Sequence, residues 1–154
     1  MSLRSCLVLV LGLGCSVLAT GCGKKLPAVV PTEGTVVLNG KPLPNAVVTF
    51  IPLLSDFGAE ASSTGTTDEQ GHFTLTCQLN NQPGATVGQH VVLVAEQPAP
   101  ENLRRVQNTR EIDTIRAKLG NRPIPPEYST FAKSQLRADV KEGQQALTIT
   151  LTRQ

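Results

Sequence analysis

The chain has 154 residues, with 14 Lys and Arg against 12 Asp and Glu, and its formal net charge is +2. So small a charge excludes the strongly basic surface that binds nucleic acid. It contains no Trp, one Tyr, two His and four Cys, and its length fits a single domain.

The N-terminus has the layout of a secretory signal, because a positive charge and an apolar run at residues 7–19 precede small residues. The run is shorter than the roughly 20 residues that span a membrane. Before Cys22, the residues Ala19, Thr20 and Gly21 resemble the lipobox of bacterial lipoproteins. This resemblance implies that the Cys22 thiol carries a diacylglyceryl group and that cleavage makes Cys22 the first residue.

We therefore expect a lipoprotein signal peptide at 1–21, a lipid-anchored tether at 22–32 and one domain at 33–152. Pro27 and Pro31 stiffen the tether and block strand pairing. Its free part extends to about 33 Å at most and lifts the domain clear of the lipid headgroups. After processing and acylation only Cys77 remains, which excludes an internal disulfide and a structural zinc site of ordinary type.

The domain begins with "EGTVVLNGKPLPNAVVTFIP" (33–52), a pattern that predicts strand, turn and strand. Asn39-Gly40 is a turn dipeptide, and the following "KPLP" indicates a connection longer than a two-residue hairpin. In the second strand Ala46, Val48 and Phe50 share one face.

A strand near 61–67 leads into "TTDEQGHFTLTC" (66–77), where Asp68 and Gly71 fit a type I turn. Phe73, Leu75 and Cys77 alternate with polar residues and point inward. The next strand, "VGQHVVLVAE" (87–96), is apolar on both faces and is predicted to be central.

Two alternating strands end the chain, and a turn at Glu142 and Gly143 separates them. Their inward residues are Leu136, Ala138 and Val140, then Leu147, Ile149 and Leu151. Seven short strands with these turns predict an all-β fold, a seven-stranded antiparallel Greek-key β-sandwich.

The segment "ENLRRVQNTREIDTIRAKLGN" (101–121) departs from this pattern, because its apolar residues have near-helical spacing. We expect a short amphipathic helix or an ordered crossover, stopped by Gly120 and Pro123. Its interspersed charges indicate a solvated face. Two interpretations stay open: the segment is a docking surface that includes Arg104, Arg105 and Arg110, or it covers an exposed strand edge.

Four stretches in series resemble the carboxypeptidase-regulatory-like domain, a transthyretin-like β-sandwich, of bacterial lipoproteins. They are "GTVVLNGKPLPNAVVTFIP", "TTDEQGHFTL", "GATVGQHVVLV" and "IPPEYSTFAKSQLRADVKEGQQALTITL". The resemblance covers nearly all of residues 33–152. It implies the sandwich fold, a surface location and a non-catalytic accessory role.

Residues that could carry chemistry also have structural interpretations, which we favour. Asp68 heads a loop that lacks the late bidentate Glu of a calcium site, so a plain turn is expected. His72 and His90 have no nucleophile or orienting acid beside them in the sequence, so surface or strand-packing roles are expected. Cys77, in phase with the core, is a small buried hydrophobe. Tyr128 is either a ligand-stacking ring or a corner residue whose hydroxyl bonds to the backbone.

The expected function is that of a lipid-anchored, non-catalytic binding, docking or structural module of the cell envelope, facing the periplasm or the exterior. Its expected partner, besides the membrane, is another envelope protein or a polysaccharide, and neither a cofactor nor a metal is expected. A carbohydrate-binding module is one alternative, although sugar sites use exposed aromatic rings and the chain has no Trp. A hydrolase on the transthyretin-like scaffold is another, although two His and one Tyr are few for such a site.

Overall fold

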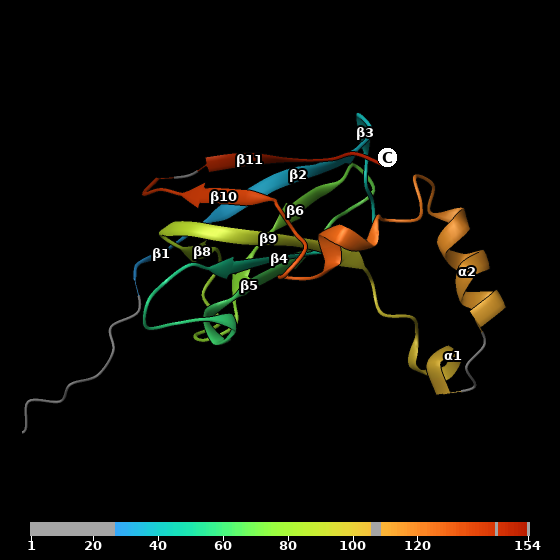
Figure 1. The fold of residues 1–154 in the computed structure, drawn as a ribbon, viewed down its shortest axis with the longest axis horizontal. Helices are drawn as coiled ribbons and strands as arrows, with labels where there is room; N and C mark the ends of the chain where they lie inside the picture. Colours follow the sequence, from blue (N-terminus) through green and yellow to red (C-terminus); the bar gives the residue numbers. More distant parts are fainter. Residues whose placement is uncertain (1–26, 106–108, 144, 154) are drawn as a thin grey trace, which may run out of the picture.

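The structure, a computed structural model, describes residues 27–105, 109–143 and 145–153 (Figure 1). The predicted signal peptide at 1–21, its predicted cleavage flank at Ala19, Thr20 and Gly21, and the predicted lipid site Cys22 lie outside these residues. The described part is mostly β, with two main sheets, a small third sheet and two helices.

Strands of the larger sheet pair antiparallel throughout. Their order is β10 (Arg137–Val140), β9 (Gly88–Glu96), β4 (Ala46–Pro52), β5 (Ser63–Thr66) and β7 (Thr76–Cys77). The predicted strand at 87–96 is β9, and its central position is confirmed because β10 and β4 flank it.

The second sheet is built around β2 (Thr32–Leu38). Its other strands are β11 (Gln145–Leu151), β3 (Lys41–Pro42) and β6 (His72–Thr74). A third, two-stranded sheet pairs β1 (Val29–Val30) with β8 (Ala85–Thr86).

The prediction of purely antiparallel pairing is wrong for β2 and β11, which are parallel over seven residue pairs. The chain leaves β10 in the larger sheet, turns at Glu142 and Gly143, and enters β11 in the other sheet. This turn connects two sheets and is not a hairpin. The direction of β11 is therefore set by how the chain crosses between the sheets, and not by antiparallel pairing with β10. Gly143 has a φ of 97° in the turn.

One apolar core lies between the two main sheets and takes side chains from both (Figure 1). Phe50 of β4 and Phe73 of β6 are fully buried there, with ring centroids 6.1 Å apart. The faces predicted for the strands are confirmed, since these inward residues are all buried: Ala46, Val48, Phe50, Phe73, Leu75, Cys77, Ala138, Val140, Ile149 and Leu151. Leu136 and Leu147 are partly buried against the same core.

The turn at Asn39-Gly40 is a two-residue hairpin, tighter than the sequence indicated. Asn39 and Gly40 have φ values of 52° and 74°, as a type I′ turn requires. They join β2 to the short strand β3, and β4 begins afterwards in the other sheet. The "KPLP" stretch therefore carries the chain between sheets and does not lengthen the hairpin.

The segment predicted as one strand at 72–77 divides between the sheets. β6 pairs with β2, whereas β7 pairs with β5. Leu75 lies at the crossing, where its N–H donates to Thr32 O at 3.0 Å and its carbonyl accepts from Gly84 N at 2.6 Å. Buried and exposed residues keep alternating from β6 through Leu75 to β7, because both strands face the same core.

The tether prediction is wrong at its C-terminal end. Val29 and Val30 pair with Thr86 and Ala85, and Val87 N donates to Ala28 O at 2.8 Å. The flanking prolines lack an N–H, but the two valines between them keep theirs, so a short strand forms. The folded domain therefore begins before residue 33.

The predicted helical segment forms two helices, α1 (Glu101–Arg105) and α2 (Thr109–Lys118). Both lie beyond the end of the sheets (Figure 1). Over the described ranges, neither has the length and apolar character that crossing a membrane requires.

Candidate functional site

The helices emerge where β9 ends at Glu96, and the chain returns to the domain at residues 119–124. α1 begins after Pro100, whose carbonyl accepts from Leu103 N and Arg104 N at 3.0 and 3.1 Å. The chain reverses after α2 through Gly120 and Asn121, with φ values of 69° and 52°. The stop predicted at Gly120 is thus confirmed as a left-handed helix end.

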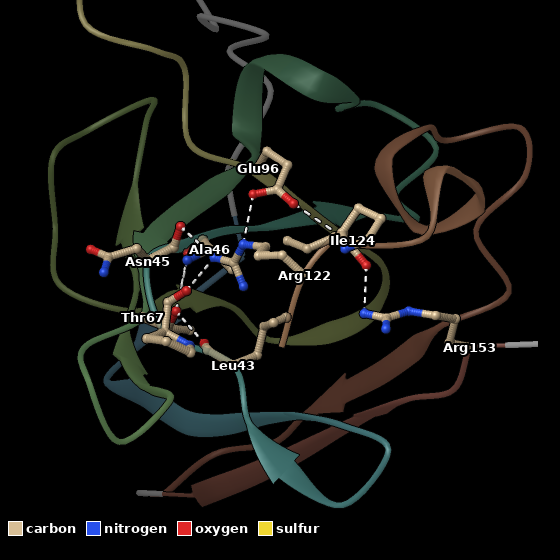
Figure 2. Close-up of polar contacts among 10 residues, drawn as sticks. Leu43, Asn45, Ala46, Thr67, Glu96, Arg122, Ile124 and Arg153 are labelled. Atoms are coloured by element: carbon tan, nitrogen blue, oxygen red, sulfur yellow. Dashed lines mark hydrogen bonds and ion pairs between the residues drawn. The ribbon is translucent and has the colours of Figure 1, made fainter. Parts of the chain in front are cut away.

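A buried ion pair fastens the returning chain to β9 (Figure 2). Arg122 Nε lies 2.8 Å from Glu96 Oε2, and the two side chains are only 4% and 20% exposed. Arg122 Nη2 also donates to the carbonyls of Pro44 and Asn45. Glu96 Oε1 accepts from Ile124 N at 3.0 Å, so the pair joins three separate stretches of chain.

Neighbouring hydrogen bonds also attach the returning chain to the turn between β2 and β3, and hold the stretch between β3 and β4. Asn121 Nδ2 donates to Leu38 O at 3.0 Å and to Lys41 O at 3.2 Å. The Thr67 hydroxyl is buried, donates to Leu43 O at 2.7 Å and accepts from the N–H of Ala46 at 2.8 Å (Figure 2). The returning chain at Asn121 and Arg122 is therefore fastened to one end of the core. The helices α1 and α2 lie beyond the end of the sheets and not along a strand edge (Figure 1), which argues against the edge-cover interpretation.

A groove of about 280 Å³ lies between α2 and the strap at 97–100. Ile112, Ile115 and Leu119 line its helix side. Glu96 and Arg116 are among its polar lining residues. The apolar stripe of the helix was expected to rest on the domain, but α2 has no buried residue, and the stripe lines this groove instead.

The predicted docking arginines lie on the helices at the same end. Arg104 and Arg105 are exposed on α1, and Arg110 is exposed on α2. Arg105 Nε donates to Glu101 Oε1 at 3.0 Å in an exposed i,i+4 pair. Such a pair contributes little to stability, so the exposed side chains of Arg104, Arg105 and Arg110 can contact a partner at little cost to folding.

His90 is a core residue and not a surface residue. Its Nε2 lies 3.1 Å from Thr86 Oγ1, its Nδ1 lies 3.0 Å from Gly88 O, and its ring centroid lies 5.7 Å from that of Phe50. Burial lowers the pKa of His90, and the Gly88 carbonyl and the charge of Asp139 only oppose that shift. The strand-packing interpretation is confirmed for His90.

Asp68 holds its turn as predicted. Its Oδ1 accepts from Gln70 N and His72 N at 2.9 and 2.8 Å, and Gly71 N donates to its carbonyl at 3.0 Å. His72 is exposed on β6, 3.9 Å from Glu33. Asp68 therefore stabilises a plain turn, and His72 occupies a surface position on its strand, as predicted.

Cys77 and Tyr128 also have the predicted structural roles. Cys77 is buried and free. The Tyr128 hydroxyl donates to Thr152 O and accepts from Thr152 N, both at 3.1 Å, and its ring packs against the core. The ring therefore holds the chain after β11 and is not presented as a flat stacking platform.

No metal centre is assembled by the described residues: within 27–105, 109–143 and 145–153, no three His, Cys, Asp or Glu side chains lie close enough to share one ion. The groove and the exposed arginines of α1 and α2 are the features at the helical end that could contact a partner.

Sequence reasoning missed the Arg122–Glu96 pair, because Arg122 was counted with the solvated charges of the helical segment. One signal distinguishes it: Arg122 follows the helix stop at Gly120 and precedes Pro123, so it lies outside the helical pattern. Glu96 likewise ends the apolar strand predicted at 87–96, where a charge needs a partner.

Comparison with models of protein families finds no match for the chain. Comparisons with curated proteins and with solved structures find no significant match either. What the molecule does must therefore be argued from its own residues.

Proposed function

We propose that the protein is a lipid-anchored, extracytoplasmic module of the bacterial envelope that docks a partner protein and does no catalysis. In this proposal its fold is a Greek-key β-sandwich of the carboxypeptidase-regulatory-like, transthyretin-like kind. The observation that carries it is the sequence Ala19, Thr20, Gly21 and Cys22 after a short apolar run. Two sheets around one core, with the chain entering at β1, are compatible with such a module.

The arrangement of the two ends supports a docking role. β1 lies at one end of the sheets, and α1 and α2 lie at the other (Figure 1). If Cys22 anchors the chain, the helices point away from the membrane. They carry exposed arginines and an apolar groove, a combination of polar rim and apolar centre that is typical of protein interfaces.

A non-catalytic role is supported by how the reactive side chains are used. His90 and Cys77 are buried in the core, and Asp68 is bonded to backbone N–H groups. A catalytic nucleophile and base need access to substrate and hydrogen-bond contact with each other, and these residues have structural contacts instead.

The anchor is tested by comparing Cys22→Ala with Cys15→Ala, a second cysteine in the same N-terminal stretch. Intact mass spectrometry should show a lipid-modified N-terminus at Cys22 in the wild type and in Cys15→Ala. Cys22→Ala should stay unprocessed and leave the detergent phase. An unmodified N-terminus at another residue would disprove the anchor.

Docking is tested separately by reversing Arg104 and Arg105 to Glu together. Charges at the rim of an interface govern association more than folding, so the melting temperature should change little while a co-purifying protein is lost from mild detergent extracts. Lys141→Glu, at the opposite end, is the control and should keep that partner. If the same proteins co-purify with all three forms, the helices are not the docking surface.

A further inference from the structure

Large apolar side chains are exposed around the hollow that follows β4, whose last residue, Pro52, pairs with His90 near the start of β9, away from the helices. Leu53, Leu79 and Phe131 are 47%, 46% and 51% exposed. Leu53, Leu54, Phe57 and Phe131 line a shallow hollow of about 410 Å³. We name these five residues the apolar end surface. Scattered exposed hydrophobic residues are normal, but a contiguous patch marks a contact surface.

Three loops carry these residues, and Phe131 lies in the third, between the 3-10 turn at Pro126–Ser129 and β10. Leu53, Leu54 and Phe57 follow β4 directly, in the stretch that leads to the short 3-10 turn at Ala59–Ala61. Leu79 lies in the loop after β7, and Gln78 N in that loop donates to Ser62 O, between the 3-10 turn and β5, at 2.8 Å.

The apolar end surface lies where the N-terminal segment joins the domain. Val87 N donates to Ala28 O, and Leu53 N donates to Gln89 O, each at 2.8 Å. Val87 and Gln89 are separated by one residue at the start of β9, so the entering chain and the first loop attach to the same short stretch. Figure 1 shows β1, β8 and this loop together at one end of the sheets.

The length of the N-terminal chain limits how far this end stands from Cys22. Ala28 already accepts a hydrogen bond within the domain, so at most the residues from Cys22 to Ala28 separate the proposed lipid site from the domain. At full extension this stretch covers about 20 Å. The tether expected from the sequence was longer, because the pairing of Val29 and Val30 was not foreseen.

We propose that the apolar end surface contacts the lipid bilayer in which Cys22 is anchored, with Leu53 and Leu79 at the boundary between headgroups and acyl chains. The inference rests on the proposed lipid anchor and adds an orientation to it. Apolar side chains at a membrane surface gain free energy by leaving water at that boundary. Lipid is the occupant because the short chain keeps this end beside the membrane permanently.

Charges near the surface indicate which force drives the contact. Asp56 and Glu60 share the first loop, and Lys133 is two residues from Phe131. With both signs present, attraction to anionic lipid is not the main force, and the apolar contact should form on zwitterionic membranes as well.

The test uses the full chain, processed and acylated in bacteria, with one cysteine introduced at Leu53 or at Leu79. Ile115→Cys is the matched control, because Ile115 is a large hydrophobic residue with 39% exposure on α2. Cys22 carries the lipid and Cys77 is buried, so an environment-sensitive thiol fluorophore labels the new position alone. The labelled proteins are reconstituted into phosphatidylcholine vesicles, with and without phosphatidylglycerol.

We expect the probes at 53 and 79 to emit at shorter wavelength on vesicles, and lipids with a spin label near the headgroup to quench them. The probe at 115 should show neither effect. If the probe at 53 stays in water like that at 115, the orientation is overturned although the anchor stands. A blue shift without quenching means that protein covers the surface, which also overturns it. Mass spectrometry of the same samples shows whether Cys22 is acylated; an unmodified Cys22 overturns the anchor and this inference with it.

Discussion

Replacement of Arg122 by Met tests how the helical end is held. The Arg122 side chain is 4% exposed and faces the carboxylate of Glu96, whose side chain is 20% exposed. Removing one member of a buried pair costs about 3–5 kcal/mol, because the other charge loses its partner. We expect a loss of about 3 kcal/mol in the free energy of unfolding, near the lower limit, since Glu96 keeps some contact with water and its bond from Ile124 N.

Arg105→Met is the matched control, because Arg105 forms an ion pair with Glu101 in which both side chains are largely exposed. An exposed pair of this kind contributes about 0–1 kcal/mol, so the two Arg→Met changes should differ by about 2 kcal/mol or more.

The assay is urea unfolding followed by far-ultraviolet circular dichroism, since the chain has no Trp for fluorescence. The double variant Arg122→Met with Glu96→Gln should be more stable than Arg122→Met alone, because no buried charge is then left unpaired. Equal losses for Arg122→Met and Arg105→Met, or a double variant that regains nothing, would refute this account of the pair.

Three further predictions use the same unfolding assay. Phe73→Ala should lose about 3–5 kcal/mol, while Thr74→Ala on the outer face should lose less than about 0.5 kcal/mol; similar losses would contradict the face assignment. Because burial lowers the pKa of His90, the unfolded chain binds a proton below about pH 6.5 that the folded chain does not. The free energy of unfolding should therefore decrease as the pH is lowered below about 6.5, by up to about 1.4 kcal/mol per pH unit. His90→Gln should abolish this slope and His72→Gln should keep it, and a slope unchanged in His90→Gln would assign it elsewhere. Tyr128→Phe should cost about 1 kcal/mol and speed amide exchange near the C-terminus; unchanged exchange there would show that the hydroxyl does not hold that end.

The faces of the strands were predictable because they depend on local pattern alone. Phe73, Leu75 and Cys77 alternate with exposed neighbours, and all three are buried. The position of the turn at Asn39-Gly40 was predictable for the same reason, since its positive φ values follow from the residues themselves. Its length was not, because the sequence does not show that Lys41 and Pro42 pair with β2.

Strand partners were not predictable, because pairing depends on residues far away in the chain. Alternation at 72–77 shows which side faces the core, but it does not show that the segment changes sheets at Leu75. The parallel pairing of β2 and β11 likewise joins the two ends of the domain. Neither feature leaves a local signal.

At the helical end, helical structure and its stop at Gly120 could be predicted, but neither the division into two helices nor the contact that fixes the returning chain could be. Burial of Arg122 depends on carbonyl groups of Pro44 and Asn45 that lie at the end of another strand. A sequence shows that an arginine is charged, but it does not show that free carbonyls and a carboxylate meet it in space.

The strand β9 has a mechanical consequence for an anchored domain. Its nine residues run from the loops next to β1 to the strap at 97–100 that leads to α1, a length of about 30 Å. The strand is hydrogen-bonded to β10 on one side and to β4 on the other. A stiff rod of this kind holds its two ends at a constant separation. If the proposed anchor at Cys22 holds one end at the lipid surface, anything bound at α1 and α2 would be kept at a set height above the membrane, and the length of one strand would set that height.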